Sequence, residues 1–357
     1  MKKIRDNKYI STVLQTWYAQ NKRDLPWRET SDPYVIWVSE IILQQTRVNQ
    51  GYDYFLRFVQ KFPNVQSLAH ANEDEVLKMW QGLGYYSRAR NLHAAAKQIV
   101  NDFNGVFPEK HQQILSLKGI GDYTAAAVAS IAFNKPYAVI DGNVYRVLSR
   151  LFAIEDPMDT SSGKKVFSET AQSILDTKNP GNHNQAIMDF GAVICTPLQP
   201  KCDVCPLQTI CLAYQSKNVT EFPKKRGKTK VKERFFNYFH VEQNNYTFIK
   251  KRSENDIWKN LYEFPLIETE SQEELPQLFE NPRFKELFKN SIEISLSHKL
   301  SLKHVLTHRI IYVNFYNIKL SGTDIFDTEK NFLKIETSNL FAYPVSRLIH
   351  KYIETLL

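Results

Sequence analysis

Hydrophobic positions in the first two thirds of the chain recur with the 3.6-residue period of amphipathic helices. Gly, Pro, Asn or Asp separates the segments, as is typical of helix ends. The segments are DEVLKMWQG (74–82), ARNLHAAAKQIVNDF (89–103), YTAAAVASIAF (123–133), VYRVLSRLF (144–152) and GKKVFSETAQSILD (163–176). The pattern predicts a mainly α-helical region from residue 1 to about residue 215.

The pattern changes to that of β-strands after residue 234. Runs rich in aromatic and β-branched residues alternate with helical patterns, and Gln243-Asn244-Asn245 separates two of the runs as in a hairpin. The strand-like runs are FFNYFHVE (235–242), YTFIKKR (246–252) and HVLTHRIIYVNFYNIKL (304–320), and the helical ones are PQLFENPRFKELFKN (276–290) and VSRLIHKYIETLL (345–357). We therefore expect the chain to end in a small α+β domain.

Length and composition limit the class of protein. A chain of 357 residues is long enough for two or three domains, and no apolar run approaches the roughly 18 residues of a membrane span. The start of the chain lacks the apolar core and cleavage site of a signal peptide, so we expect a cytoplasmic protein. The net charge of +8 and the pI near 9.0 favour a polyanionic partner.

A basic segment, PKKRGKTKVKER (223–234), joins the two regions. It holds seven Lys or Arg residues and one Glu, together with a Pro and a Gly. This composition is typical of an exposed connector, and it also suits contact with a DNA backbone. Both interpretations stay open at the level of sequence.

All four cysteines of the chain, Cys195, Cys202, Cys205 and Cys211, lie in one short stretch. Zinc sites usually pair two C-x2-C hooks, whereas the spacing C-x6-C-x2-C-x5-C places one such hook between single cysteines. The irregular spacing favours a [4Fe–4S] cluster. A four-cysteine zinc site and a chance grouping are the alternatives.

Two glycines precede an Ala-rich helical pattern in LKGIGDYTA (117–125). A turn of this kind presents backbone N–H groups at a helix N-terminus, which suits an anion. It matches the hairpin of a helix-hairpin-helix motif, which grips a DNA phosphate without reading sequence. Lys118, Gly119 and Gly121 are then the candidate contacts to the DNA backbone, and a generic Gly turn is the alternative.

Glu40 is the first of two candidate catalytic carboxylates. It lies inside the apolar run VIWVSEIILQQT (35–46), where Ile36, Trp37 and Leu43 would be neighbours on a helix. Desolvation there would raise its pKa and make it a general acid near neutral pH. An ordinary surface glutamate is the alternative.

Asp141 is the second candidate. It precedes Gly-Asn and a helical pattern, so helix N-capping alone would explain it. A carboxylate at that position can also stabilise a developing cation. Together with Glu40 it supplies the acid and the anion that cleavage of a glycosidic bond needs.

Taken together, these features resemble a known family. In order and spacing, six segments and the four cysteines are similar to the endonuclease III superfamily of DNA glycosylases, and most closely to the MutY-type adenine DNA glycosylases. The segments are RDLPWR (23–28), SEIILQQTRV (39–48), GLGYYSRARNL (82–92), LKGIGDYTAAAVASIAF (117–133), IDGNVYRVLSR (140–150) and NQAIMDFGAVIC (184–195), which leads into the cysteines. The end of the chain resembles the Nudix-related module of that family, chiefly in IWKNLYEFPLI (257–267) and HVLTHR (304–309).

The resemblance implies a monofunctional enzyme that flips adenine out of duplex DNA where it is mispaired with 8-oxoguanine or G, and leaves an abasic site. It implies double-stranded DNA as partner, a nucleoid-associated monomer without membrane contact, and a [4Fe–4S] cluster that shapes a DNA-binding loop and is not catalytic. The expected organisation is a helical catalytic region (1–217) with a six-helix barrel module, a hairpin motif (about 113–133) and a cluster loop (195–211), then a basic linker (218–231) and a Nudix-like 8-oxoguanine-recognition domain (232–357).

The resemblance also implies roles for single residues. Glu40 would protonate adenine N7 and Asp141 would stabilise the oxocarbenium-like sugar, while Tyr123 and Asn143 would position these two groups. The adenine pocket would be formed by Arg23, Trp27, Arg28 and Gln185, the gap in the base stack would be filled by Gln45 and Tyr85, and 8-oxoguanine would be read by Leu306, Thr307 and His308.

Two places depart from the family pattern. Lys118 stands where relatives usually have Pro, and Leu306-Thr307-His308 replaces Phe-Ser-His. Thr307 keeps a hydroxyl and His308 is retained, but Leu306 cannot stack as Phe does. The strength of 8-oxoguanine recognition by this loop is therefore open.

Tyr123 distinguishes two close relatives. Glycosylase/lyases of the same fold have a lysine nucleophile there, and tyrosine cannot form its Schiff base. The C-terminal region also lacks the Glu-rich REUXEE box of Nudix hydrolases, so we expect it to read a base and not to hydrolyse a nucleotide. The alternatives are an oxidised-pyrimidine glycosylase/lyase of the endonuclease III type, a non-catalytic Fe–S DNA-binding or redox-sensing protein, and a zinc-dependent regulator.

Overall fold

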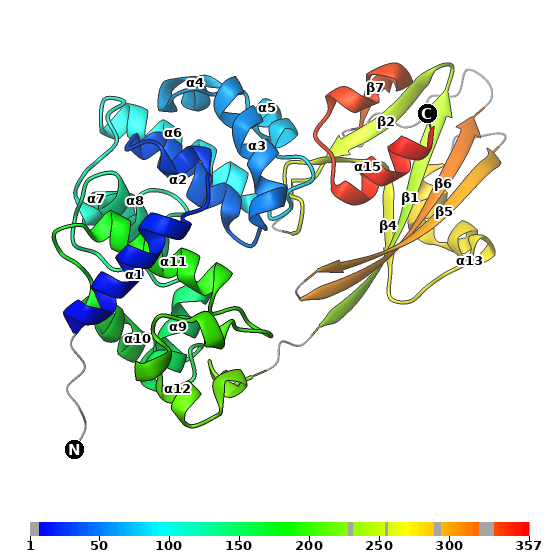
Figure 1. The fold of residues 1–357 in the computed structure, drawn as a ribbon. Coiled ribbons are helices and arrows are strands. Elements are labelled where there is room, and N and C mark those ends of the chain that lie inside the picture. The colour runs from blue at the N-terminus through cyan, green and yellow to red at the C-terminus, as the bar shows by residue number, and fades with distance from the viewer. Residues whose placement is uncertain are drawn as a thin grey trace. The chain divides into compact units, whose positions relative to one another are not determined.

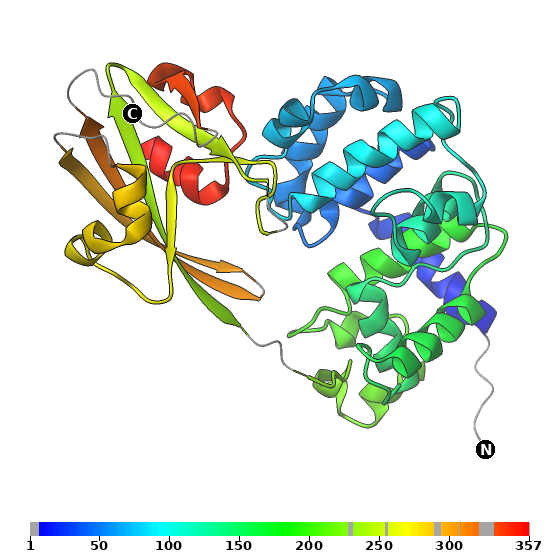
Figure 2. The ribbon, with the colours of Figure 1, turned by 180° about the vertical axis from the view of Figure 1, so that it is seen from behind.

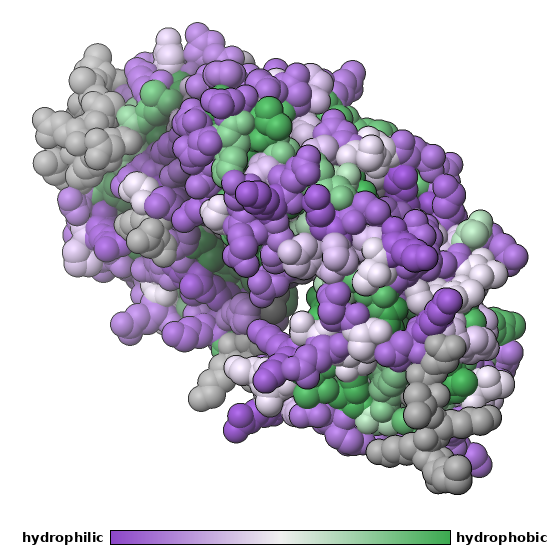
Figure 3. Space-filling view, turned by 90° about the vertical axis from the view of Figure 1, so that its left-hand side faces the viewer, coloured by the Kyte–Doolittle hydropathy of each residue, from purple (hydrophilic) through white to green (hydrophobic). Residues whose placement is uncertain are grey.

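The computed structural model describes residues 7–227, 231–253, 256–288, 294–306, 308–320 and 332–356. The chain divides into two compact units, one of Met1–His70 and Asn91–Gly227 and the other of Ala71–Arg90 and Lys228–Leu357 (Figure 1). Hydrophilic side chains cover much of the surface seen in Figure 3, and hydrophobic ones appear in separate patches. Among the described residues, no helix is long and apolar enough to cross a membrane.

The first unit is built of helices, which confirms the prediction from the 3.6-residue period (Figure 1). One helix, α6, begins in the second unit and continues into the first. The helices are α1 (Asn7–Asn21), η1 (Pro26–Arg28), α2 (Pro33–Leu43), α3 (Val48–Lys61), α4 (Val65–His70), α6 (Ser87–Asp102), α7 (His111–Leu115), α8 (Asp122–Ile131), α9 (Gly142–Phe152), α10 (Ser161–Ile174), α11 (Pro180–Val193), η2 (Cys202–Val204), η3 (Gln208–Ile210), α12 (Leu212–Gln215) and η4 (Val219–Glu221).

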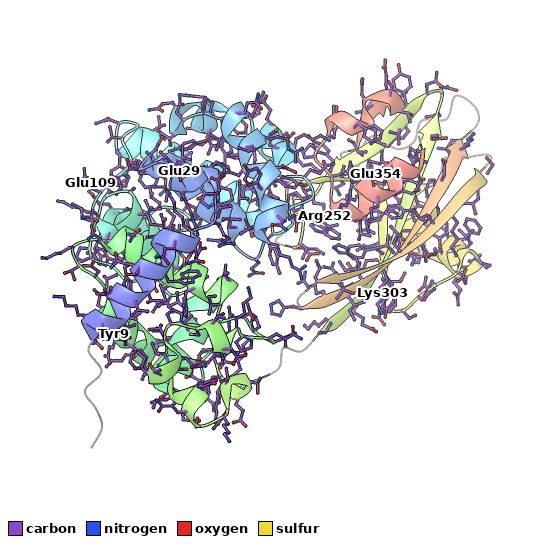
Figure 4. All side chains as sticks on the ribbon, viewed as in Figure 1. Tyr9, Glu29, Glu109, Arg252, Lys303 and Glu354 are labelled. Carbon is purple, nitrogen blue, oxygen red and sulfur yellow. The ribbon has the colours of Figure 1, made fainter. Side chains whose placement is uncertain are left out.

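One hydrophobic core of this unit is formed by one face each of α1, α8, α9, α10 and α11. In α1 the inward residues Ile10, Leu14 and Trp17 follow a spacing of three or four, and Tyr9 on α1 is about half exposed (Figure 4). Trp17 meets Phe190 of α11 edge to face, with ring centroids 5.2 Å apart. Each such buried side chain contributes roughly 1.5–3 kcal/mol, so the core fixes α9 and α11 relative to α1.

The second unit contains a sheet with strand order β3-β2-β1-β6-β5, in which β4 also pairs with β1 and β7 with β2. The β1–β6 pair is parallel and the others are antiparallel. The strands are β1 (Lys232–Gln243), β2 (Tyr246–Lys251), β3 (Tyr262–Glu263), β4 (Leu266–Thr269), β5 (Ile294–Leu306), β6 (Arg309–Leu320) and β7 (Leu333–Glu336), and the helices are α5 (Glu73–Met79), α13 (Leu275–Glu280), α14 (Pro282–Leu287), η6 (Thr337–Ala342), α15 (Arg347–Ile353) and η7 (Glu354–Leu356).

Both faces of this sheet are covered, because alternate residues of β1 enter two separate cores. Phe236 and Tyr238 pack in the core that includes α15, whereas Phe239 and Val241 pack in the core that includes α13 and α14. Figures 1 and 2 show α15 and α13 on opposite faces of the sheet. The observed fold is therefore the expected helical region followed by an α+β domain.

Two sequence patterns are interrupted in the structure. The strand-like run 304–320 contains a turn, because β5 ends at Leu306 and pairs there with Arg309 at the start of β6. The helical pattern 276–290 is divided into α13 and α14, since Pro282 has no N–H to continue a helix and starts the second one.

Candidate active site

A cavity of about 690 Å³ lies in the first unit. Its walls are formed by residues of η1, α2, α3, α8, α9, α10 and α11 and of the turns next to them. The residues predicted from the sequence that line it are Arg23, Trp27, Arg28, Glu40, Gln45, Gly121, Tyr123, Asp141, Asn143 and Gln185.

Glu40 lies in α2 with its side chain buried in the cavity wall. Burial raises the pKa of Glu40 to about 7. The Tyr123 hydroxyl donates a hydrogen bond to Glu40 Oε2 at 2.5 Å and opposes that rise. The charge of Asp141 adds to the rise, and that of Arg28 opposes it. At neutral pH this carboxyl therefore exists in both protonated and ionised forms, as expected from its apolar neighbours in the sequence.

Asp141 lines the same cavity and is also the N-cap of α9. Its carboxylate accepts hydrogen bonds from the Val144 N–H and from Asn143 Nδ2, both at 2.8 Å. Burial raises the pKa of Asp141, and these two bonds oppose the rise because they favour the ionised form. Asp141 can therefore cap α9 and line the cavity at the same time, since the cap hydrogen bonds hold its carboxylate at the start of the helix.

A buried acid that the sequence analysis missed holds the two arginines of the expected base pocket. Asp189 of α11 is fully buried. It accepts hydrogen bonds from Arg23 Nη2 and from Arg28 Nη1 and Nη2, each at 2.5 Å. Burial alone would raise the pKa of Asp189, but the two arginines outweigh it and lower the pKa. Like Glu40, Asp189 is a lone carboxylate in an apolar helical run, and that signal could have identified it.

Gln185 is oriented by a tyrosine of α1. The Tyr18 hydroxyl donates to Gln185 Oε1 at 2.7 Å, which leaves the amide hydrogens on Nε2 for another partner. The Arg28 guanidinium carbon lies 5.5 Å from the centroid of the Tyr18 ring. Trp27 is buried edge to face against Phe55, with centroids 5.0 Å apart. The cavity thus combines an amide donor with aromatic and planar cationic surfaces.

The glycine turn connects α7 and α8 as a helix-hairpin-helix. Gly119 has a φ of +77°, and a Cβ built on it would lie 2.5 Å from Cβ of Asn91. Gly121 is the N-cap of α8 in an extended conformation, with open space around it. The side chain of Lys118 is exposed beside them. Only Gly119 is therefore required by the backbone geometry of the turn.

Gln45 and Tyr85 both have left-handed backbones, with φ of 56° and 49°. Residues other than Gly rarely adopt this conformation, and at functional sites it costs roughly 1–3 kcal/mol. Gln45 lines the cavity of the first unit. Tyr85 belongs to the second unit and is 47% exposed. Contacts around each residue must offset this cost.

The four cysteines line one small cavity of about 30 Å³ and form no disulfide. Burial raises the pKa of Cys205 to about 12, and the neighbouring thiols raise it further. Ionisation becomes favourable when bound cations replace the protons, so the donor set fits an iron–sulfur centre. Among the described residues, no group of three or more His, Cys, Asp or Glu side chains is arranged to hold a single metal ion.

Helix α9 connects the cysteine loop to the main cavity. Arg146 donates from Nε to the Cys195 carbonyl at 2.6 Å and from Nη2 to Asn143 Oδ1 at 2.7 Å. Arg150, one turn further on, donates to Cys195 Sγ at 3.4 Å. The helix capped by Asp141 therefore also fixes the start of the cysteine loop, through two arginines that the sequence analysis did not single out.

The residues expected to read 8-oxoguanine lie at the turn between β5 and β6. Leu306 is partly buried against the core that includes α15, so its side chain supports the turn from within. His308 is exposed, and its carbonyl accepts a hydrogen bond from the Lys232 N–H at 3.0 Å. Thr307 lies outside the described residues. Of the two described residues of this turn, Leu306 packs inward and His308 has the exposed side chain.

Comparison with known proteins defines the class. Residues 38–173 match the HhH-GPD superfamily of base excision DNA repair proteins, and residues 237–355 match the NUDIX domain. The chain is 32% identical to a thermostable thymine-DNA glycosylase of known structure, with a TM-score of 0.55 over 59% of this chain and 97% of that one. The protein is a helix-hairpin-helix base-excision glycosylase with a C-terminal Nudix-type domain.

Two relatives that match this chain over nearly its full length identify the family within this class. Adenine DNA glycosylase of Buchnera aphidicola subsp. Acyrthosiphon pisum is 36% identical over 88% of this chain and 87% of its own. That of subsp. Baizongia pistaciae is 33% identical over 96% of each. The chain belongs to the adenine DNA glycosylase family, whose members are hydrolases that act on N-glycosidic bonds.

Proposed function

We propose that this protein removes adenine mispaired with 8-oxoguanine or G in duplex DNA and leaves an abasic site. One observation supports this most directly. Glu40, with a pKa of about 7, shares a cavity with Asp141, whose hydrogen bonds favour the carboxylate. Such a division between two carboxyls suits an acid-catalysed glycosidic cleavage.

Glu40 donates its proton to N7 of the flipped adenine, so that the base leaves as a neutral molecule. A carboxyl with a pKa of about 7 is both present as the acid at neutral pH and able to release its proton. Tyr123 orients it through the hydroxyl hydrogen bond. The sugar left behind is cationic, and Asp141, with Asn143 bonded to it, stabilises that charge until water adds at C1′.

The adenine is held by polar and planar groups of the same cavity. Gln185 donates from Nε2 to an acceptor nitrogen of the base, because Tyr18 already occupies its oxygen. Trp27 packs beside the base. Arg23 and Arg28 offer planar surfaces whose charge Asp189 partly neutralises.

The remaining DNA contacts are distributed over both units. Gln45 and Tyr85 fill the space in the stack that the flipped base leaves, since an amide and an aromatic ring both suit that position. Thr307 and His308 contact 8-oxoguanine, and Leu306 supports their turn. The DNA backbone is bound by the hairpin residues Lys118, Gly119 and Gly121.

A [4Fe–4S] cluster bound by Cys195, Cys202, Cys205 and Cys211 supplies shape to the loop 195–211 and no chemistry to base removal. Lys201, exposed next to Cys202, then faces the DNA backbone. The catalytic region covers 1–217, the basic linker 218–231 and the recognition domain 232–357. The protein acts as a monomer.

Strand cleavage is not part of the reaction, because Tyr123 stands where a lyase needs an amine. The amine of Lys164 also lies in the cavity wall, so the test for a lyase step must cover this residue. Borohydride should trap no covalent adduct with DNA. An adduct that disappears in Lys164→Met would assign a lyase step to that amine and contradict this part of the proposal.

The proposal as a whole is tested by strand scission. Duplexes with A opposite 8-oxoguanine, A opposite G, or thymine glycol opposite A are incubated with the full chain, and half of each sample is heated in alkali. We expect scission at both adenines only after alkali, and none at thymine glycol. Scission at thymine glycol without alkali, or no alkali-labile site at adenine, would overturn it.

A further inference from the structure

Residues 71–90 group with residues 228–357 into one compact unit. Hydrogen bonds join this segment to the C-terminal sheet. Asp74 accepts from Lys251 Nζ at 2.6 Å and from the Tyr262 hydroxyl at 3.1 Å. The segment is therefore part of the second unit, although it lies more than a hundred positions earlier in the chain.

The loop after α5 is bonded to both backbone groups of Val345. The Val345 N–H donates to Gln81 Oε1 at 3.2 Å, and the Tyr86 hydroxyl donates to the Val345 carbonyl at 3.3 Å. The same hydroxyl accepts from the Gly82 N–H at 3.3 Å. Tyr86 and Val345 are buried, so water competes little for these bonds.

Lys78 adds a third connection. Its ammonium donates to the Phe341 carbonyl at 2.5 Å and to Gln81 Oε1 at 3.3 Å. The Gln81 oxygen is thus shared between Lys78 and Val345. Both ends of the loop are consequently fixed to residues 341–345, which precede α15 in the chain.

Tyr85 lies inside this loop in a left-handed conformation, next to Gly84, whose φ is also positive. The Gly84 carbonyl accepts hydrogen bonds from Trp80 Nε1 at 3.2 Å and from Arg88 Nη2 at 3.1 Å. A bulky residue stays at positive φ only where the surrounding contacts determine its conformation. Here those contacts come from within the loop and from Val345.

We propose that Val345, acting through Gln81 and Tyr86, positions Tyr85 for its entry into the DNA stack. This inference rests on the role of Tyr85 under the proposed function. It gives the C-terminal domain a part in base flipping, beside recognition of the base opposite adenine. Gln81 and Tyr86 are positioning residues and touch no substrate.

Hydrogen exchange of the full chain tests whether Gln81 and Tyr86 hold the loop around Tyr85, and it does not depend on enzymatic activity. Gln81→Met and Tyr86→Phe remove the acceptor and the hydroxyl but keep the size of the side chains. In the double variant, amide exchange over 81–86 should rise about 10-fold and stay unchanged in α9. The matched control is Tyr312→Phe, which removes a hydroxyl bonded to Glu233 at 3.1 Å. Unchanged exchange over 81–86 in the double variant would overturn the inference.

Base flipping gives a second readout. With 2-aminopurine in place of adenine opposite 8-oxoguanine, the double variant should show a several-fold smaller fluorescence increase than the unchanged protein and Tyr312→Phe. In a Tyr85→Ala background the same two substitutions should have no further effect, because they act only through the ring. A full additive loss in that background would contradict the inference. If the unchanged protein released no adenine, the proposed function would fail, while the exchange experiment would still decide this inference.

Discussion

Glu40 and Asp141 line one cavity, and burial raises the pKa of both carboxyls, but their hydrogen-bond partners differ. Burial dominates at Glu40 and brings its pKa to about 7. At Asp141 burial also raises the pKa, and the cap hydrogen bonds from the backbone and from Asn143 oppose that rise because they favour the carboxylate. Two carboxyls in one cavity can therefore serve as acid and as anion at the same pH.

Tyr123→Phe should move the pH dependence of adenine release. The hydroxyl bond lowers the pKa of Glu40, so its loss raises that pKa above about 7. Glu40 then keeps its proton to higher pH. In single-turnover assays across the pH range, the alkaline decline should shift upward by about 1 unit, with a lower maximum because the carboxyl is less well oriented. A decline that stays in place or moves to lower pH would count against this.

Glu40→Gln should stabilise the protein at alkaline pH. Because the pKa of Glu40 is about 7 in the folded chain against an ordinary 4.5, the folded state binds more protons than the unfolded state between these values. Stability is thus lost as pH rises through about 7. The neutral variant avoids this and should gain roughly 2–3 kcal/mol above that pH. Urea unfolding of both proteins, below and above the pH range between the two pKa values, measures this difference in the free energy of unfolding. Equal stabilities of the variant and the unchanged protein at alkaline pH would refute the prediction.

The burial of Glu40 could be predicted from the sequence, because the apolar residues around it on the helix are its near neighbours in the chain. Asp189 was missed although its neighbours are equally apolar. Asp189 matters to the site because it pairs with Arg23 and Arg28, and these two residues lie 166 and 161 positions away in the chain. Local patterns predict burial, but they do not show which charge a buried group meets.

At the scale of elements, the hairpin between α7 and α8 requires glycine at one of its two glycine positions. Gly119 has a positive φ and little space for a Cβ, whereas Gly121 has neither restriction. Gly119→Ala should therefore lower the free energy of unfolding by about 1–2 kcal/mol and weaken DNA binding. The control Gly121→Ala should change the stability much less. Equal losses in denaturant unfolding would show that the turn is not fixed by Gly119.

Periodicity predicted several of the helices and the long strands, but not where they are interrupted. The run 304–320 is uniformly strand-like in composition, and only the pairing of Leu306 with Arg309 reveals its turn. Leu306 also shows why composition is an incomplete guide to recognition. The resemblance to the family aligns it with a residue that usually stacks, and in the fold it packs inward.

At the scale of the whole molecule, the helical half and the α+β half were predictable from sequence, but their division in space was not. Residues 71–90 have a helical pattern like their neighbours, yet Asp74 and Gln81 hydrogen-bond to residues of the C-terminal part. These partners are 177 and 264 positions distant in the chain, and periodicity carries no information about them.

The cysteine loop supports a prediction about the intact protein. Purified full chain should contain about four iron and four sulfide ions per molecule and be yellow-brown. Cys202→Ser should lose most of the iron and unfold at lower denaturant concentration, because a bound cluster no longer closes the loop whose start Arg146 and Arg150 hold on α9. Metal analysis and unfolding curves measure both. A colourless protein with one zinc would rule out the cluster.

The central claim is that Glu40 is the acid that releases adenine. It is tested by single-turnover excision with Glu40→Gln on a duplex with A opposite 8-oxoguanine, beside the affinity for the same duplex. Glutamine keeps the size of the side chain and the contact with Tyr123 but has no acidic proton. We expect release to fall by at least about 100-fold with affinity nearly unchanged. Release close to that of the unchanged protein would mean that the acid lies elsewhere.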